Sequence, residues 1–443
     1  MEETSLSTTK LNPEEVNIAV FGLGFVGLPL ALSYALKGCN VIGVDIDRNL
    51  VDQLNRGITH HLEKYRETPI QDVLSQQLSN GRFRAASDAK EALARCTYFI
   101  MTVGIPVINR NHDMSHVESC ARTIAGGLKK GDLVLVRSTV VPGMTRDFVK
   151  PILEETGLKA GEDFFLAYSS ERIAEGKAFD EFENMPALIA GLNEESRDTA
   201  CRLMNIVTKE LHPASSLEVV ETAKVMENIS RDVNIAMVNE FARFCESLSI
   251  DIFELIKLAN THKRVKLLTP GPGVGGYCIP NALHYLTPKA DELGVPLKLL
   301  RTARKINEDV PAFVVSLVTR NLPVPAREAK IAVLGMAMKD YSSDDRLSPA
   351  LDVISHLKTS GITVAAFDPA VPSEYEFKVN SLEEAIKDAH GIVILAKQNG
   401  IGYTNFRLFD RLMSKAGALF IVDTKNLYNR AEVEQHGFIL EAI

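Results

Sequence analysis

The sequence predicts an α/β protein with two Rossmann-like, doubly wound parallel-sheet domains joined by a long central helical region. Short apolar runs alternate with helical segments over the first part of the chain, and the same alternation restarts after residue 329. Between them, residues 216–259 contain neither proline nor glycine. We expect a first domain at residues 1–208, a central helical dimerisation and catalytic region at 209–320 and a second α/β domain at 321–443.

Composition places the chain among ordinary globular proteins. Of its 443 residues, 46% are apolar and 24% are charged, so each domain can bury a core of its own. The formal net charge of −8 creates no global positive field that would attract a phosphate backbone. We therefore expect no nucleic-acid partner, although a local basic pocket can still hold a small anion.

Cysteine usage and hydropathy indicate a cytoplasmic protein. The six cysteines form no CxxC pair and follow no secretory leader, so we expect reduced thiols. Residues 18–36 carry no charge over 19 positions, which meets the length of a membrane span. Three glycines, Pro29 and an acid-rich N-terminus argue against both a span and a signal peptide, and we expect no membrane association.

The first domain opens with a strand–helix–strand unit. The run NIAVFG is followed by a glycine-rich turn, the helical stretch PLALSYALKG and a second apolar run, NVIGVD. Further strands are expected at 97–104, 132–139 and 163–169.

The turn in this unit carries a dinucleotide motif. Gly22, Gly24 and Gly27 form GxGxxG between the expected strand and helix, where backbone N–H groups and a helix N-terminus can face a pyrophosphate. Asp45 ends the next strand, 18 residues after Gly27, where it can accept a hydrogen bond from a ribose 2′-hydroxyl and repel a 2′-phosphate. The cofactor we expect is NAD; the alternative is a glycine turn that serves packing alone.

Residues 216–259 have apolar positions at helical spacing, and they predict mostly long helix. We expect its large apolar face to form a packing or dimer surface, so a homodimer is predicted.

The second α/β domain follows the proline-containing linker at 321–329. Its opening, IAVLGMAM, echoes IAVFGLGF, and VAAFDPA echoes VIGVDID. Because the later copy has lost the glycines of the turn, we expect it to bind something other than a dinucleotide pyrophosphate.

Residues 270–280 (PGPGVGGYCIP) form the most unusual segment. Its glycines, among them the substrate-binding candidate Gly275, indicate backbone that approaches a ligand closely or adopts positive φ. Cys278 follows directly, before a proline suited to the first turn of a helix. A helix N-terminus favours the thiolate, which is the nucleophilic form, whereas an isolated cysteine is usually a small buried hydrophobe. The glycine context favours the reactive interpretation for Cys278 alone.

Several ordered motifs resemble the UDP-glucose/GDP-mannose dehydrogenase family over nearly the whole chain. They are GLGFVGLPLA, STVVPGMT, SERIAEGKA, AKVMENISRDVNIAMVNE, RVKLLTPGPGVGGYC and MKDYSSDDRLSPALD. The forms ENISRDVNIAMVNE and PGPGVGG are most similar to the branch that oxidises UDP-N-acetylhexosamines, such as UDP-N-acetylmannosamine.

The resemblance implies a four-electron oxidation of a UDP-sugar at C6. A first hydride goes to NAD, the aldehyde is captured by the cysteine thiolate, a second hydride leaves to another NAD, and the thioester is hydrolysed to the uronate. Covalent capture prevents loss of the aldehyde between the two cofactor exchanges.

The resemblance also implies residue roles. Cys278 matches the nucleophile, and Lys224 with Asn228 matches the pair that binds the sugar and stabilises the oxyanion; their i, i+4 spacing independently places both on one helical face. Glu171 matches the general acid/base, and Thr139 matches a hydroxyl that orders the catalytic water beside the cofactor.

Three basic residues match substrate contacts. Arg264 matches an arginine that reaches the neighbouring subunit's sugar site, where its fork suits a pyrophosphate. Lys339 and Arg346 match residues near the nucleotide half of the substrate. For all three, the alternative is a solvated surface charge. No metal is expected, because His112 and His116 lack a third ligand pattern.

The chain departs from the family at Ala282, which stands where the family has the aspartate that supports hydrolysis. A methyl group cannot accept a proton. Three hypotheses follow: a complete 6-dehydrogenase in which Glu171 or His284 compensates, a two-electron dehydrogenase that stops at an aldehyde or keto sugar, and a catalytically silent nucleotide-sugar binding protein.

Overall fold

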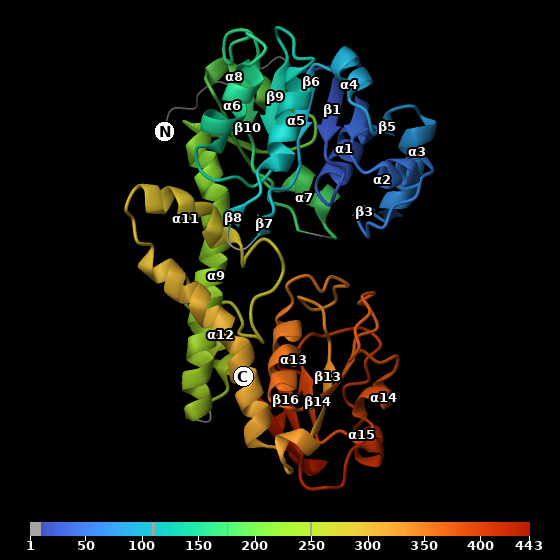
Figure 1. Cartoon of the computed structure of the whole chain (residues 1–443), viewed down its shortest axis with the longest axis vertical. Helices are drawn as coiled ribbons and strands as arrows, with labels where there is room; N and C mark the ends of the chain where they lie inside the picture. Colours follow the sequence, from blue (N-terminus) through green and yellow to red (C-terminus); the bar gives the residue numbers. More distant parts are fainter. Residues whose placement is uncertain (1–9, 109–110, 175, 249) are drawn as a thin grey trace. The chain divides into compact units, whose positions relative to one another are not determined.

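The computed structural model describes residues 10–108, 111–174, 176–248 and 250–443, so the N-terminal segment considered above as a leader lies partly outside the described residues. The chain divides into two compact units (Figure 1). The first unit comprises residues 1–226 and 284–294, and the second comprises 227–283 and 295–443. The central part of the sequence contributes to both units, because two of its helices continue from one unit into the other.

The first unit is built on an eight-stranded sheet of order β12-β11-β10-β9-β6-β1-β2-β5, in which every described pairing is parallel except β10 with β11. The strands are β1 (Asn17–Phe21), β2 (Asn40–Val44), β5 (Phe83–Ala86), β6 (Tyr98–Met101), β9 (Leu133–Val136), β10 (Phe165–Tyr168), β11 (Ala187–Gly191) and β12 (Leu211–Pro213). Two hairpins, β3 (Lys64–Tyr65) with β4 (Thr68–Pro69) and β7 (Val107–Ile108) with β8 (Asn111–His112), stand apart from the sheet.

Helices cover both faces of this sheet, as the doubly wound prediction requires (Figure 1). They are α1 (Gly27–Leu36), α2 (Arg48–Asn55), α3 (Ile70–Ser79), α4 (Lys90–Arg95), α5 (Ser115–Ala125), α6 (Lys150–Glu154), α7 (Ala178–Asn184) and α8 (Glu194–Met204).

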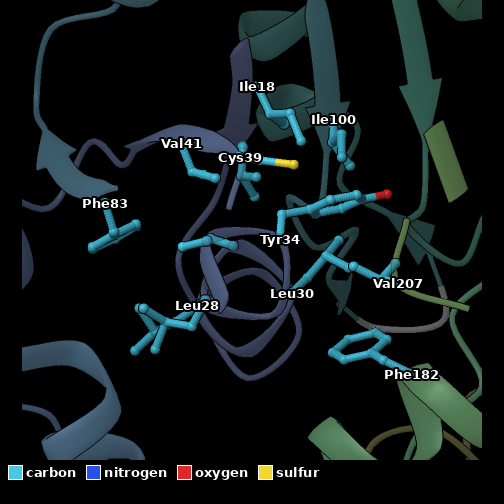
Figure 2. Packing of buried hydrophobic residues seen from close by; sticks show 14 of the residues in the cluster. Ile18, Leu28, Leu30, Tyr34, Cys39, Val41, Phe83, Ile100, Phe182 and Val207 are labelled. Atoms are coloured by element: carbon cyan, nitrogen blue, oxygen red, sulfur yellow. The ribbon is translucent and has the colours of Figure 1, made fainter. Parts of the chain in front are cut away.

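Helix α1 lies at the centre of the first unit's core, with nine of its ten residues buried. Figure 2 shows Leu28 and Leu30 projecting from α1 in different directions, Leu30 toward Val207, with Tyr34 nearby. Burying one such leucine contributes about 1.5–3 kcal/mol. The uncharged run at 18–36 is therefore a buried strand, a turn and a buried helix. Within the described ranges, no helix combines the length and apolar character needed to cross a membrane.

The second unit contains a five-stranded parallel sheet of order β14-β13-β15-β16-β17. Its strands are β13 (Lys330–Leu334), β14 (Thr363–Phe367), β15 (Gly391–Ile394), β16 (Leu419–Asp423) and β17 (Phe438–Ala442). Its helices are α10 (Ile252–Ala259), α12 (Lys298–Arg320), α13 (Pro349–Thr359), α14 (Leu382–Ile386), α15 (Phe406–Leu412) and α16 (Arg430–Gln435). Separate apolar clusters pack on the two faces of the sheet, so the predicted fold class is confirmed.

The long central helix is α9 (Leu217–Ser247), followed by α10. Asp251 caps α10 by accepting hydrogen bonds from the N–H groups of Phe253 and Glu254, so the helical run at 216–259 is divided in two. A further helix of the central region, α11 (Ala282–Glu292), begins in the second unit and continues into the first.

The loop between β1 and α1 shows why its glycines differ. Gly22 has a φ of +94°, which a side chain would strain. A Cβ on Gly27 would overlap the carbonyl oxygen of Gly22, whereas a Cβ on Gly24 would meet nothing within 4 Å. Gly27 therefore allows α1 to pack closely against the backbone of Gly22, whereas the space beside Gly24 is open.

We expect Gly27→Ala to destabilise the protein by about 3 kcal/mol, because the new methyl group overlaps backbone that cannot move without breaking the turn. Thermal unfolding of the ligand-free protein measures this. Gly24→Ala is the matched control and should leave the unfolding temperature nearly unchanged; equal destabilisation by both substitutions would contradict the assignment of Gly27 to packing.

Candidate active site

The cofactor crevice lies at the carboxyl ends of the first sheet. Strands β1 and β6 are neighbours, yet the chain continues from β1 to one side and from β6 to the other, which opens a crevice at this edge. The Gly22–Gly27 loop follows β1 at that point. The open space at Gly24 allows a pyrophosphate to approach the backbone, so the residues present fit a dinucleotide.

Asp45 lies at the same edge, directly after β2, and is half-buried. Its Oδ2 accepts a hydrogen bond from the Leu23 N–H at 2.7 Å, and its Oδ1 accepts one from the Asp47 N–H at 3.0 Å. These bonds hold the Asp45 carboxylate beside the Gly22–Gly27 loop, and its oxygens can still accept a further hydrogen bond from a ribose hydroxyl. The neighbouring Ile46 is 85% exposed and offers an apolar surface beside the carboxylate.

Thr139 follows β9, the strand next to β6 in the sheet, and is half-buried. Its neighbour Ser138 donates a hydrogen bond to the carbonyl oxygen of Val103, and so joins the loops that follow the two strands. Thr139 therefore lies at the carboxyl edge, close to the crevice.

Glu171 is held in a buried ion pair that sequence reasoning missed. Its Oε2 lies 2.6 Å from Nη2 of Arg137, and the two side chains are 11% and 3% exposed. Its Oε1 accepts the N–H groups of Arg172 and Ile173 at 2.6 and 2.8 Å. Both carboxylate oxygens are thus engaged. A charged residue at the end of the apolar run LVLVR is the signal that could have indicated a buried partner.

A small cavity of about 20 Å³ adjoins this ion pair. The hydroxyl of Ser170 and Nε of Arg137 are buried without a hydrogen-bond partner among the described residues. The cavity is large enough for one water molecule, which would satisfy these groups.

Lys224 and Asn228 lie four residues apart on α9, so they share one helical face as predicted from their spacing. Lys224 is half-buried and belongs to the first unit, whereas Asn228 is 7% exposed and belongs to the second.

Cys278 is the exposed member among the six cysteines, all of which lie in the described ranges. Burial raises the pKa of Cys39 and Cys96 to about 12 and that of Cys201 to about 11, which keeps these thiols protonated. Cys278 lies in a turn, and α11 begins only at Ala282, so Pro280 precedes the helix rather than occupying its first turn. Exposure, more than the helix dipole, makes this thiol available.

Ala282 stands at the position where the family resemblance implies an aspartate, so its neighbours are the candidates for supplying a base in its place. Ala282 is 2% exposed at the start of α11, and His284 follows two positions later, roughly 200° around the helix. Burial, and to a smaller extent the charge of His284, lowers the pKa of His112, and both histidines belong to the first unit. His284 therefore points away from the side of Ala282. Among the described residues, no group of three metal-ligating side chains is placed to hold an ion.

The glycine-rich loop packs closely against Met338 and the Leu347–Pro349 segment of the second unit. A Cβ on Gly275 would come within 2.6 Å of Pro349 and 2.9 Å of the Leu347 carbonyl oxygen. The glycine at this position therefore permits close packing against the protein itself and not against a ligand. A Cβ on Gly271 would instead meet nothing within 4 Å. The open position in this loop is Gly271.

A pocket of about 360 Å³ lies in the second unit between this loop and the sheet. It is lined by Thr269–Gly273 and by residues that follow β13, β15 and β16, at the carboxyl edge where the strand order reverses. Its charged residues are Lys339, Lys425 and Asp340, and Lys425 lies 2.9 Å from Asp340. The lining carries one more positive than negative charge, which suits a phosphate-bearing ligand.

The remaining basic candidates are exposed. Arg346 forms a bidentate pair with Asp344, with Nη2 and Oδ2 2.6 Å apart. Burial would raise the pKa of Asp344, but the hydrogen bonds from Arg346 outweigh it and hold that pKa below its usual value. Arg264 is exposed in the segment after α10. The candidates divide between the two units. The first unit contains Gly22, Gly24, Gly27, Asp45, Thr139, Glu171 and Lys224, and the second contains Asn228, Arg264, Gly275, Cys278, Lys339 and Arg346.

Comparison with known proteins assigns the chain to a family. Models of the UDP-glucose/GDP-mannose dehydrogenase family match its NAD binding domain at residues 16–211, its central domain at 218–309 and its UDP binding domain at 332–430. The first match confirms NAD as the cofactor.

The relatives are nucleotide-sugar dehydrogenases. The chain is 35% identical to the UDP-N-acetyl-D-mannosamine dehydrogenase of Pyrococcus horikoshii, over 97% of this chain and 99% of that one. It is 32% identical to the UDP-N-acetyl-D-glucosamine 6-dehydrogenase of Pseudomonas aeruginosa, over 86% and 90% of the two chains.

Solved structures agree with these relatives. That of the P. horikoshii enzyme has a TM-score of 0.88, with 97% and 99% of the two chains covered. The UDP-N-acetyl-mannosamine dehydrogenase Cap5O of Staphylococcus aureus has a TM-score of 0.81 at 31% identity, over 96% and 98% of the chains. With all three domains matched in order, the protein belongs to the UDP-glucose/GDP-mannose dehydrogenase family, whose members are NAD-dependent oxidoreductases.

Proposed function

We propose that the protein oxidises the C6 hydroxyl of a UDP-N-acetylhexosamine to the carboxylate in two hydride transfers, with Cys278 as the covalent nucleophile. The observation that carries the proposal is the exposure of Cys278 at the end of the glycine-rich loop, while the other cysteines are buried. The mannosamine and glucosamine relatives support the N-acetylhexosamine.

NAD, when bound, would supply the hydride acceptor for each of the two oxidations. Gly22, Gly24, Gly27 and Asp45 would hold it, with the pyrophosphate at the open Gly24 and the ribose at the Asp45 carboxylate. The UDP half of the substrate would occupy the pocket lined by Lys339 and Lys425.

The protein's part of the reaction consists of nucleophilic attack and charge stabilisation. In the first step the C6 alcohol loses a proton and a hydride and becomes an aldehyde. The Cys278 sulfur then adds to the carbonyl carbon, and Lys224 and Asn228 stabilise the resulting oxyanion. Loss of a second hydride converts this thiohemiacetal into a thioester. Water cleaves the thioester, which yields the carboxylate and returns the thiol.

A two-electron reaction that stops at an aldehyde or keto sugar is the second candidate; it includes no hydrolytic step and is therefore compatible with the absence of a free base for hydrolysis. Ala282 provides no base, and Glu171 is engaged by Arg137 and two backbone N–H groups. Thr139 remains the candidate that orders the water. The silent binding protein is the third hypothesis.

We further propose a cytoplasmic homodimer. On α9, Met237, Phe241 and Phe244 are 39%, 43% and 63% exposed and recur at spacings of four and three residues, so they form an apolar stripe on one side of the helix. A second copy of the chain is the occupant we propose for this stripe. Arg264 would then reach the sugar site of the partner subunit.

The number of NADH molecules formed per substrate distinguishes the three functions. We expect two, together with the uronate, from UDP-N-acetylmannosamine or UDP-N-acetylglucosamine, measured at 340 nm with excess NAD. One NADH per substrate would favour the two-electron reaction, and none with any nucleotide sugar would favour the binding protein. UDP-glucose, UDP-N-acetylgalactosamine and GDP-mannose complete the panel.

Cys278→Ser should lower uronate formation by at least about 1,000-fold, because a hydroxyl is a far weaker nucleophile than a thiolate. NAD affinity should remain nearly unchanged, because the Gly22–Gly27 loop and Asp45 lie in the first unit, whereas Cys278 lies in the second. Product analysis and NAD titration measure the two effects. An unchanged uronate yield would refute the thiolate role.

Phe244→Glu should convert the dimer into monomers, because a carboxylate at the most exposed position of the stripe would be buried in the interface without a partner. Light scattering gives the molar mass in solution. Leu299→Glu on α12, at a position 68% exposed outside the stripe, is the matched control and should stay dimeric. A wild-type molar mass equal to that of a single chain would contradict the proposed homodimer.

A further inference from the structure

A chain of buried polar side chains connects α9 and α12 with the glycine-rich loop, entirely within the second unit. Asn307 donates from Nδ2 to the carbonyl oxygen of Asp232 at 2.9 Å and to its Oδ1 at 2.8 Å. Asn239 donates from Nδ2 to Oδ1 of Asn307 at 2.9 Å. The N–H of Gly271 donates to Oδ1 of Asn239 at 3.2 Å. Arg304 completes the chain with a 2.9 Å bond to Oδ1 of Asp232.

The four side chains in this network are almost fully buried. Asn307 and Asn239 are 1% and 2% exposed, and Asp232 and Arg304 are 4% and 6% exposed. Around them, apolar residues of α9 and α12 belong to one core cluster, among them Val238, Ala242, Val310 and Val314. Water therefore cannot replace a lost partner at low cost, and each hydrogen bond must be made within the protein.

The direction of every bond in the chain is determined by its two ends. At one end, the carbonyl oxygen of Asp232 can only accept, so the amide nitrogen of Asn307 must face it. The oxygen of Asn307 then faces Asn239, which must present its nitrogen. At the other end, the N–H of Gly271 can only donate, and it meets the remaining oxygen of Asn239. Both amides therefore have one orientation compatible with the network.

This network ends on the loop segment that forms one wall of the 360 Å³ pocket. Thr269–Gly273 lines the pocket together with Lys339 and Lys425, and a Cβ built on Gly271 in that wall would meet nothing within 4 Å. We propose that Asn239, oriented by Asn307 and Asp232, is a positioning residue that fixes the Thr269–Gly273 wall and thereby sets the affinity of the pocket for the UDP half of the nucleotide sugar. This inference rests on the proposed function for the identity of the ligand.

A neighbouring contact explains why the effect should be local. Asn234, also on α9, donates to the Lys266 carbonyl oxygen at 2.7 Å and accepts from the Leu268 N–H at 2.8 Å. The entry to the loop is thus held separately. Loss of the Asn239 bond should release the wall at Gly271 without unfolding the segment before it.

The test combines hydrogen exchange with ligand binding in the full-length protein. In Asn239→Ala and Asn307→Ala, a peptide covering residues 269–276 should exchange faster than in wild type, in the absence of any ligand. The dissociation constant for UDP, measured by calorimetry, and the KM for the UDP-sugar should rise about tenfold in Asn239→Ala, with NAD KM unchanged and kcat within about twofold. The hydrogen bonds of Asn307 among the described residues go to Asp232 and Asn239, so an effect of its substitution tests transmission through Asn239.

Asn55→Ala is the matched control. Asn55 makes two hydrogen bonds with the backbone of Ala85 in the first unit, at 2.9 and 3.0 Å, so its loss should affect stability but not UDP binding. Asn239→Asp supplies a second variant of native size: its carboxylate can still accept from Gly271 but cannot donate to Asn307, and it should also weaken UDP binding.

The outcomes separate this inference from the proposed function. Unchanged exchange at 269–276 in Asn239→Ala, or faster exchange with unchanged UDP affinity, would overturn the positioning role. Faster exchange spread over the whole second unit would assign these residues to general stability and would also overturn it. Wild-type protein that binds UDP but forms no NADH would refute the proposed reaction and leave the positioning role supported by exchange and UDP affinity. Wild-type protein that binds no UDP would overturn the affinity claim itself.

Discussion

Carboxylates that accept hydrogen bonds from backbone N–H groups hold the loops that carry several candidate site residues of this protein. Asp45 accepts from Leu23 in the glycine turn, and Glu171 accepts from Arg172 and Ile173. Glu221, 0% exposed on α9, accepts from Gly143 and Thr145 at 2.6 and 3.0 Å, in the segment that follows Thr139. Such charge-assisted bonds are stronger than neutral ones, and a loop held by them keeps its polar backbone satisfied while it stays open to a ligand.

The same interaction has different consequences in the two halves of the molecule. Asp368 directly follows β14 in the C-terminal sheet, just as Asp45 directly follows β2 in the N-terminal sheet. The Oδ2 of Asp368 accepts hydrogen bonds from the N–H groups of Met336 and Ala337. Asp368 is 1% exposed, however, and Gln398 also donates to it at 3.1 Å. It is therefore unavailable to a ribose. The repeated motif preserves the turn in the second sheet, while the half-buried Asp45 can also meet a ligand.

What could be predicted from sequence is local in the chain. Strands, the Gly22–Gly27 turn and the i, i+4 pair Lys224 and Asn228 follow from periodicity and spacing over a few residues. The Arg137–Glu171 pair joins residues 34 positions apart, and the Asn239–Asn307 bond joins residues 68 apart. No local pattern specifies such partners, because they meet only after the sheet or the helices have packed. For Gly275, close backbone approach was foreseeable from the glycine, but its partner, Pro349, was not.

The replacement at residue 282 affects one step of the proposed reaction more than the others. The hydride transfers and the attack by Cys278 do not require a base at that position, whereas hydrolysis of the thioester benefits from one. General-base assistance contributes typically about 10²–10⁴-fold. The Glu171 carboxylate is engaged, and His284 lies on another side of α11 from Ala282, so neither is well placed to restore that factor. A thioester remains an activated acyl group that water can attack unaided. In the proposed reaction, an alanine at this position therefore favours slow release of the uronate from Cys278 over loss of the oxidation itself.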